Sequence, residues 1–130
     1  MVYTPEEKRK MENVLQAFAQ YTASSPDFDM VYSEKVGYVR MITAECADAI
    51  YFVMEDFESL VDMFCMDIVA DAVQIALDND PDVENSDIDY DAIRAEIQVY
   101  IDRIDEKYRS QAEDIANRHI LLDSCDSRLP

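Results

Sequence analysis

Lysine and arginine are missing from a long part of this 130-residue chain. Residues 41–93 contain fifteen acidic side chains and no basic one, whereas residues 1–40 carry six acidic and five basic side chains and residues 94–130 carry eight and six. The net charge of −18 is therefore concentrated in the middle of the sequence. Nucleic acid and anionic membranes would be repelled by such a surface, so both are poor partners, and a basic protein surface is the natural one.

Other absences narrow the class of protein further. No run approaches eighteen apolar residues, so the sequence predicts no transmembrane helix, and the N-terminal MVYTPEEKRK lacks the apolar segment of a secretory signal. The three cysteines, Cys46, Cys65 and Cys125, are widely spaced and form no CxxC motif, which favours free thiols and a cytoplasmic location. With 49% hydrophobic residues, the chain is predicted to fold as a single domain over residues 1–130.

The sequence also lacks the signatures of common catalytic and metal sites. It has no GxSxG, no phosphate-binding loop and no HExxH. His119 is the only histidine, and its position near the end of a predicted helix favours a structural role. Acidic pairs at i, i+4, such as Glu58 and Asp62, are expected by chance among twenty-nine acidic residues. We therefore predict a non-enzymatic protein without a cofactor or a bound metal.

The N-terminal third contains signals for one helix and a β-hairpin. Thr4, Pro5 and Glu7 form a capping box that opens a helix, and the helix is expected to end near residue 23. Residues 29–43 (DMVYSEKVGYVRMIT) predict two strands around an SEK turn, and Gly37, the only glycine, is expected at a bulge or a positive-φ turn position. Residues 49–54 favour a third strand, with one long helix over residues 43–77 as the alternative.

The C-terminal half reads as two helices. Asp56 is a good N-cap for a helix from Phe57 to about Leu77, whose two apolar flanks are expected to be covered. A second helix is predicted from residue 88 or 89 to Leu121, about 50 Å long, and part of it is expected to pair with another chain. The predicted fold class is α+β in the order α-β-β-β-α-α, with an N-terminal helix, a three-stranded antiparallel sheet and two C-terminal helices.

The loop between the two C-terminal helices is the most acidic stretch. Residues 78–92 (DNDPDVENSDIDYDA) hold seven carboxylates, and Asp78, Asp80 and Asp82 occupy the first, third and fifth positions of an EF-hand calcium loop. That loop needs glycine at its sixth position, where this chain has the β-branched Val83. A specific calcium site is therefore not predicted, while weak, unspecific cation binding by the loop remains open.

A small, strongly acidic domain with this order of elements resembles some anti-CRISPR proteins, which imitate DNA and block the groove where Cas9 reads its protospacer-adjacent motif. The resemblance covers the whole chain as element order and charge, without a shared residue motif. It implies a DNA mimic. The α-β-β-β-α order is also that of double-stranded-RNA-binding domains, but these domains hold phosphates with basic residues, and the charge here has the opposite sign.

The leading hypothesis is accordingly a non-enzymatic DNA mimic that binds a basic, nucleic-acid-binding protein surface, such as that of a CRISPR nuclease, and neither nucleic acid nor membrane. The alternative is an intracellular interaction or scaffold domain that forms a homodimer through the long C-terminal helix. The candidate contact residues are nine carboxylates: Asp67, Asp71, Asp78, Asp80, Asp82, Glu84, Asp87, Asp89 and Asp91.

Overall fold

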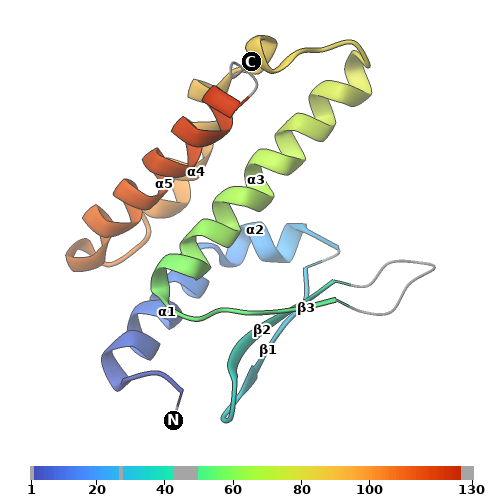
Figure 1. Ribbon diagram of the computed structural model, residues 1–130. Coiled ribbons are helices and arrows are strands. Elements are labelled where there is room, and N and C mark those ends of the chain that lie inside the picture. The colour runs from blue at the N-terminus through green and yellow to red at the C-terminus, as the bar shows by residue number, and fades with distance from the viewer. Residues whose placement is uncertain (1, 27, 43–49, 127–130) are drawn as a thin grey trace. The chain divides into compact units, whose positions relative to one another are not determined.

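The computed structural model describes residues 2–26, 28–42 and 50–126 (Figure 1). They form an α+β fold with an N-terminal helical segment, a three-stranded antiparallel sheet and C-terminal helices, which confirms the predicted class. The elements are α1 (Pro5–Ala17), α2 (Ala19–Ser24), β1 (Met30–Ser33), β2 (Gly37–Ile42), β3 (Ile50–Val53), α3 (Phe57–Asn79), the 3₁₀ helix η1 (Asn85–Asp87), α4 (Tyr90–Ile101) and α5 (Glu106–Asp126).

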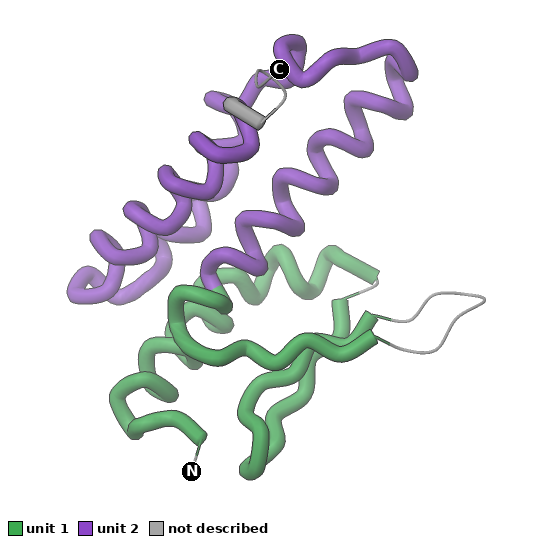
Figure 2. Tube along the Cα trace, viewed as in Figure 1, with its two compact units in different colours: residues 1–60 green, residues 61–130 purple. Residues whose placement is uncertain are grey.

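The chain divides into two compact units, unit 1 (residues 1–60) and unit 2 (residues 61–130), and the division falls within α3 (Figure 2). Both units contain fully buried apolar side chains. In unit 1 they include Met11, Val14 and Phe18, and in unit 2 they include Phe64, Ile68, Ile97, Ile101 and Ile104. This division into compact units does not test the prediction that residues 1–130 form a single domain.

The N-terminal helical segment begins where the sequence indicates. Thr4 Oγ1 accepts a hydrogen bond of 3.1 Å from the Glu7 N–H, and Pro5 is the first helical residue. Glu7 was expected to complete the capping box, but its Oε1 instead accepts a hydrogen bond of 2.6 Å from the Phe57 N–H at the start of α3. The helix is interrupted at the buried Phe18 and ends at Ser24, one residue beyond the predicted position.

The sheet has the order β1-β2-β3, so β1 and β3 are its edges. Ser33 pairs with Gly37 across the turn, and Gly37 has φ of 91°, which confirms the positive-φ turn predicted for the only glycine. Val39 of β2 pairs with Val53 of β3. The preferred strand over residues 49–54 is therefore confirmed at Ile50–Val53, while residues 43–49 of the alternative helix lie outside the described residues.

The side chain of Tyr3 takes part in this sheet. Its hydroxyl accepts a hydrogen bond of 2.9 Å from the Tyr38 N–H and donates to the Met54 carbonyl oxygen, while the Met54 N–H donates directly to the Tyr38 carbonyl at 2.9 Å. The hydroxyl thus replaces one bond of the ladder between β2 and the residue that follows β3. A Cβ on Gly37 would overlap this hydroxyl, so the turn requires glycine for space as well as for φ. Burial raises the pKa of Tyr3, which keeps the hydroxyl protonated as a donor.

The single long helix predicted from residue 88 to Leu121 is wrong, because the chain turns between α4 and α5. Asp105 Oδ1 accepts a hydrogen bond of 3.2 Å from the Lys107 N–H, as an N-cap does. The Arg109 guanidinium donates to the carbonyl oxygens of Asp102, the C-cap of α4, and of Ile104, which lies in the turn, at 3.2 and 3.0 Å. The helical spacing of apolar residues continues across the turn, so the pattern alone did not reveal the break.

The turn between α4 and α5 lets the apolar residues of these two helices be buried within one chain. Helices α4 and α5 pack together, and Tyr108 and Ile115 of α5 are buried within the chain. A homodimer through one long helix therefore lacks the helix on which that hypothesis rested. The expected coverage of both flanks of α3 is confirmed for the buried Phe64, Ile68 and Val69, but it is wrong at Met66, Ile75 and Leu77, which are exposed.

Replacing Tyr3 with Phe removes the hydroxyl from the ladder and leaves the Tyr38 N–H and the Met54 carbonyl without this partner. We expect the free energy of unfolding, measured by urea denaturation, to fall by about 1–3 kcal/mol. Tyr51→Phe is the matched control, since Tyr51 is 62% exposed, and should change stability by less than about 0.5 kcal/mol. Equal effects of the two substitutions would contradict the role assigned to the Tyr3 hydroxyl.

Asp105→Ala distinguishes the observed turn from a continuous helix by the sign of its effect. Loss of the N-cap should lower the free energy of unfolding by about 0.5–2 kcal/mol. In a continuous helix the same substitution would stabilise the protein, because alanine is the better residue in a helix interior. Thermal unfolding followed by far-UV circular dichroism measures the change, with Asp114→Ala at an exposed position within α5 as the control.

Candidate functional site

All nine predicted contact residues lie in unit 2. Asp67, Asp71 and Asp78 are on α3, and steps of four and seven residues keep them on one face of that helix. The other six follow in the loop after α3, in η1 and at the start of α4: Asp80, Asp82, Glu84, Asp87, Asp89 and Asp91. The structure therefore continues one acidic helix face into an acidic loop. These nine residues are called the acidic surface below.

The loop is the denser part of the acidic surface. Asp67 is half-buried, and the other eight carboxylates belong to exposed residues. Asp67 and Asp78 are about 16 Å apart along the axis of α3, and three carboxylates over that length are sparser than the phosphates of one DNA strand, spaced about 3.4 Å apart along the duplex axis. Residues 80–91 add six carboxylates within twelve residues, so the loop approaches that density more closely than the helix does.

Backbone N–H groups hold several of these carboxylates in place. Asp80 Oδ1 accepts a hydrogen bond of 3.1 Å from the Asp82 N–H, and Asp89 Oδ1 accepts one of 3.0 Å from the Ala92 N–H as the N-cap of α4. Each bond uses one carboxylate oxygen as acceptor. The structural role of Asp89 was not predicted, although Asp followed by a helical pattern is the signal of an N-cap.

A second pair of carboxylates caps η1. Asp87 Oδ2 accepts a hydrogen bond of 3.2 Å from the Glu84 N–H, and the Glu84 side chain accepts one from the Asp87 N–H, which together form a capping box. On α3, Asp78 Oδ1 accepts a hydrogen bond of 2.9 Å from Gln74 Nε2. For Asp82 and Asp91, by contrast, the described part of the chain shows no side-chain hydrogen bond or ion pair.

Asn85 fixes η1 to the C-terminal end of α5. Its Nδ2 donates to the carbonyl oxygen of Asp123 at 3.2 Å, and its Oδ1 accepts a hydrogen bond from the Tyr90 hydroxyl. The acidic loop is thus tied to unit 2 by a neutral side chain in its middle, as well as by its two ends. This arrangement favours a defined presentation of the carboxylates.

In the structure, residues at the positions of calcium ligands in an EF-hand loop have other hydrogen-bond partners. Asp78, at the first position of the hypothetical calcium loop, still belongs to α3 and bonds to Gln74, and Asp80 bonds to its own turn. Within residues 2–26, 28–42 and 50–126, no group of three or more His, Cys, Asp or Glu side chains is arranged to hold a metal ion. Among the loop carboxylates, those of Asp80, Asp87 and Asp89 each accept a hydrogen bond from a nearby backbone N–H.

A shallow groove of about 260 Å³ lies between α3 and α4, beside the acidic loop. Small apolar side chains from both helices line it, and carboxylates from η1 and α4 stand along it. The lining residues are Ala72, Ala76, Asp87, Ile88, Asp89, Ala92, Ile93 and Glu96. The groove is therefore lined by apolar and acidic side chains together.

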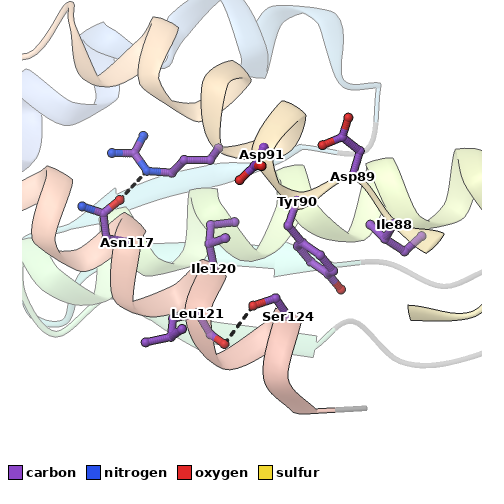
Figure 3. Close-up of a pocket in the computed structure, with 9 residues that line it drawn as sticks. Ile88, Asp89, Tyr90, Asp91, Asn117, Ile120, Leu121 and Ser124 are labelled. Atoms are coloured by element: carbon purple, nitrogen blue, oxygen red, sulfur yellow. Dashed lines mark hydrogen bonds between the residues drawn. The ribbon is translucent and has the colours of Figure 1, made fainter. Parts of the chain in front are cut away.

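A larger pocket of about 470 Å³ lies where the start of α4 faces the C-terminal part of α5 (Figure 3). Asp89, Tyr90 and Asp91 line it from one side, and Asn117 and Leu121 are among the α5 residues on the other. Arg94 also lines this pocket, and it is the first basic residue after residue 40. Its guanidinium donates to Asn117 Oδ1 and to Gln98 Oε1, two neutral acceptors, so it keeps its charge close to the acidic residues.

His119 connects α5 to α3. Its Nδ1 lies 2.8 Å from Asp62 Oδ1, and its Nε2 lies 3.0 Å from Asp123 Oδ2. The sequence pointed to a structural role for His119 but did not reveal these two partners. The buried Cys65 has its pKa raised to about 12, mainly by desolvation, so its thiol is not a nucleophile near neutral pH.

No helix in the described residues is long and apolar enough to cross a membrane. Compared with protein-family models, curated proteins and solved structures, the chain shows no significant match. Its function is therefore inferred from its own surface, on which the acidic loop and the groove beside it are the main features of unit 2.

Because the described residues hold no group of three or more carboxylate, His or Cys side chains placed to bind a metal ion, we predict no specific effect of calcium. At about 1 mM, calcium and magnesium should raise the melting temperature equally, because both act only by screening repulsion between carboxylates. Differential scanning calorimetry measures the shift. A saturable calcium signal in the micromolar range that Asp82→Ala abolishes would contradict this and restore the calcium-loop interpretation.

Proposed function

We propose that this protein is a non-enzymatic DNA mimic, similar to anti-CRISPR inhibitors, that occupies the basic groove of a nucleic-acid-binding protein such as a CRISPR nuclease in the cytoplasm. The observation that carries the proposal is the acidic surface, which extends from Asp67 to Asp91 without one Lys or Arg. Eight of its nine carboxylates belong to exposed residues of a single compact unit. A surface of this sign and density attracts a Lys- and Arg-rich groove and repels nucleic acid itself.

The way the loop holds its carboxylates supports binding to cations. Asp80 and Asp89 each use Oδ1 to accept a backbone N–H, and the second oxygen of each carboxylate has further capacity to accept. A guanidinium that meets such an oxygen forms a charge-assisted hydrogen bond, which is stronger than one between neutral groups. Because these side chains are already ordered, less conformational entropy is lost when the partner binds.

The groove between α3 and α4 offers a place for a long basic side chain. Its alanines, Ala72, Ala76 and Ala92, suit the aliphatic stem of Lys or Arg, and the carboxylates of Asp87 and Glu96, which also line it, suit the charged end. A phosphate backbone has no such apolar groups. The groove would therefore add contact area to an interaction that is otherwise electrostatic.

Affinity for the partner should fall steeply as salt rises, since the contact replaces counterions on two oppositely charged surfaces. The test begins with the immobilised chain, a lysate, and washes of increasing salt. The protein released at high salt is then purified and titrated against this chain, in the presence and absence of a short DNA duplex. The DNA-mimic hypothesis expects the duplex and the chain to exclude each other.

Charge reversal at Asp82 and Asp91 tests the acidic surface itself. Neither side chain has a hydrogen bond or ion pair within the described part of the chain, so Asp82→Lys/Asp91→Lys should leave the fold intact. We expect the double variant to bind the purified partner about tenfold more weakly or worse, because two attractions become repulsions.

The matched control, Glu34→Lys/Asp114→Lys, changes the net charge equally at exposed positions outside the acidic surface. It should retain most of the affinity. Glu7 is unsuitable as a control, because its side chain accepts the Phe57 N–H and lies 3.9 Å from Lys10 Nζ. Equal losses from the two double variants, or a partner that binds this chain and its nucleic acid together, would reject DNA mimicry in favour of a scaffold role.

A further inference from the structure

Strand β3 is an edge of the sheet, and all four of its residues are exposed. The exposed fractions are 51% for Ile50, 62% for Tyr51, 48% for Phe52 and 48% for Val53. Both faces of the strand are therefore open, because successive side chains of a strand point to opposite sides. An apolar edge strand with two open faces is unusual, since unpaired edges are prone to pairing with another chain.

The main-chain groups of β3 that face away from β2 follow from the register. Met54 donates its N–H to the Tyr38 carbonyl, so Phe52 and Ile50, two and four residues earlier, also direct their N–H and carbonyl groups toward β2. Tyr51 and Val53 then direct theirs outward. The edge thus offers two residues, spaced for an antiparallel ladder, to a further strand.

The sequence provides little protection for this edge. Residues 49–54 include no charged residue and no proline, and these are the features with which edge strands usually prevent pairing. The opposite edge, β1, is followed directly by Glu34 and Lys35 in the turn to β2. Neither strand contains a charged residue, but β1 is flanked directly by Asp29 and Glu34, whereas β3 is flanked by Ala49 and Met54.

We propose that two copies of this chain associate by pairing their β3 strands antiparallel, which joins two three-stranded sheets into one of six strands. Outward-facing residues must pair with each other, and the register in which Tyr51 of one copy meets Val53 of the second is the one that uses both outward-facing residues of each strand. This register places Phe52 on the two-fold axis, facing Phe52 of the second copy in a non-hydrogen-bonded pair with a Cα separation of about 4.5 Å. Aromatic and β-branched residues in cross-strand positions are favourable pairs.

Charge is the reason to expect a second copy here and not the basic partner of the acidic surface. Unit 1 carries eleven acidic and five basic side chains, a net charge of −6, whereas unit 2 carries eighteen and six, a net charge of −12. A cationic segment would gain nothing from an uncharged strand. An identical strand places only the uncharged residues 50–54 opposite one another, so the ladder itself adds no repulsion between carboxylates.

The contact is short, with four strand residues from each copy, and its area falls below that of standard stable interfaces. We therefore expect a weak dimer, with a dissociation constant of about 10–100 μM, that strengthens as salt screens the net charge of −18. This salt dependence is opposite to that expected for the basic partner, so the two interactions are distinguishable.

Sedimentation equilibrium of the full chain up to about 1 mM, in low and high salt, provides the first test. The wild type should reach a dimer in high salt. Phe52→Lys should raise the dissociation constant at least about tenfold, because two lysines would meet at the two-fold axis. Val31→Lys, at the 45% exposed position on β1, is the matched control and should leave the dimer unchanged. If Phe52→Lys loses its circular dichroism spectrum, Tyr51→Lys replaces it.

A cysteine crosslink tests the register, in a background with Cys46→Ser and Cys125→Ser. Phe52→Cys places two thiols at a Cα separation that a disulfide spans, whereas Ile50→Cys places them about 14 Å apart, beyond its reach. Oxidation should therefore give a covalent dimer for Phe52→Cys alone. A monomer at every concentration and salt, assemblies larger than dimers, or equal crosslinking of the two variants would overturn the proposal.

Discussion

Hydrogen bonds from backbone N–H groups to carboxylates support the acidic half of this molecule. Residues 41–93 contain no Lys or Arg, so charge repulsion within this segment has to be offset by other groups. The N-terminus of each helix in the segment supplies them: Asp56 accepts the Ser59 N–H in α3, Glu84 and Asp87 cap η1, and Asp89 caps α4. Positive ends of helices stabilise these carboxylates. The same side chains reach the surface, so folding and the proposed binding of cations draw on the same residues.

In unit 1, the side chain of Tyr3 satisfies main-chain groups of the sheet. The Tyr3 hydroxyl stands between the Tyr38 N–H and the Met54 carbonyl, and Gly37 leaves room for it. This contact attaches the segment before α1 to the sheet next to the end of β3. It also marks where the regular ladder ends. All four residues of β3 pair with β2. The main-chain groups of Tyr51 and Val53 face outward, and these are the groups that we propose pair with a second chain.

Local signals in the sequence gave correct predictions wherever the determining contact spans only a few residues. The cap at Thr4, the positive-φ turn at Gly37 and the cap at Asp56 were found because each depends on a short pattern of residue types. Apolar spacing likewise indicated the strands and the helix α3. The acidic surface was visible as a count of charges, and its nine residues do lie along one continuous part of unit 2. What each carboxylate bonds to was not visible in that count.

The sequence by itself determined the fold class, the caps at Thr4 and Asp56 and the location of the negative charge, because these depend on neighbouring residues and on composition. Tertiary structure decided the turn at Asp105, where the apolar spacing continues unbroken and only the capping bonds reveal the end of α4. It also decided which apolar residues are left exposed, such as Ile75 and Phe52, and that His119 lies between Asp62 and Asp123. Burial and long-range hydrogen bonds depend on residues that are far apart in the chain. The spacing of apolar residues along one helix or strand does not show which distant residues that element will contact.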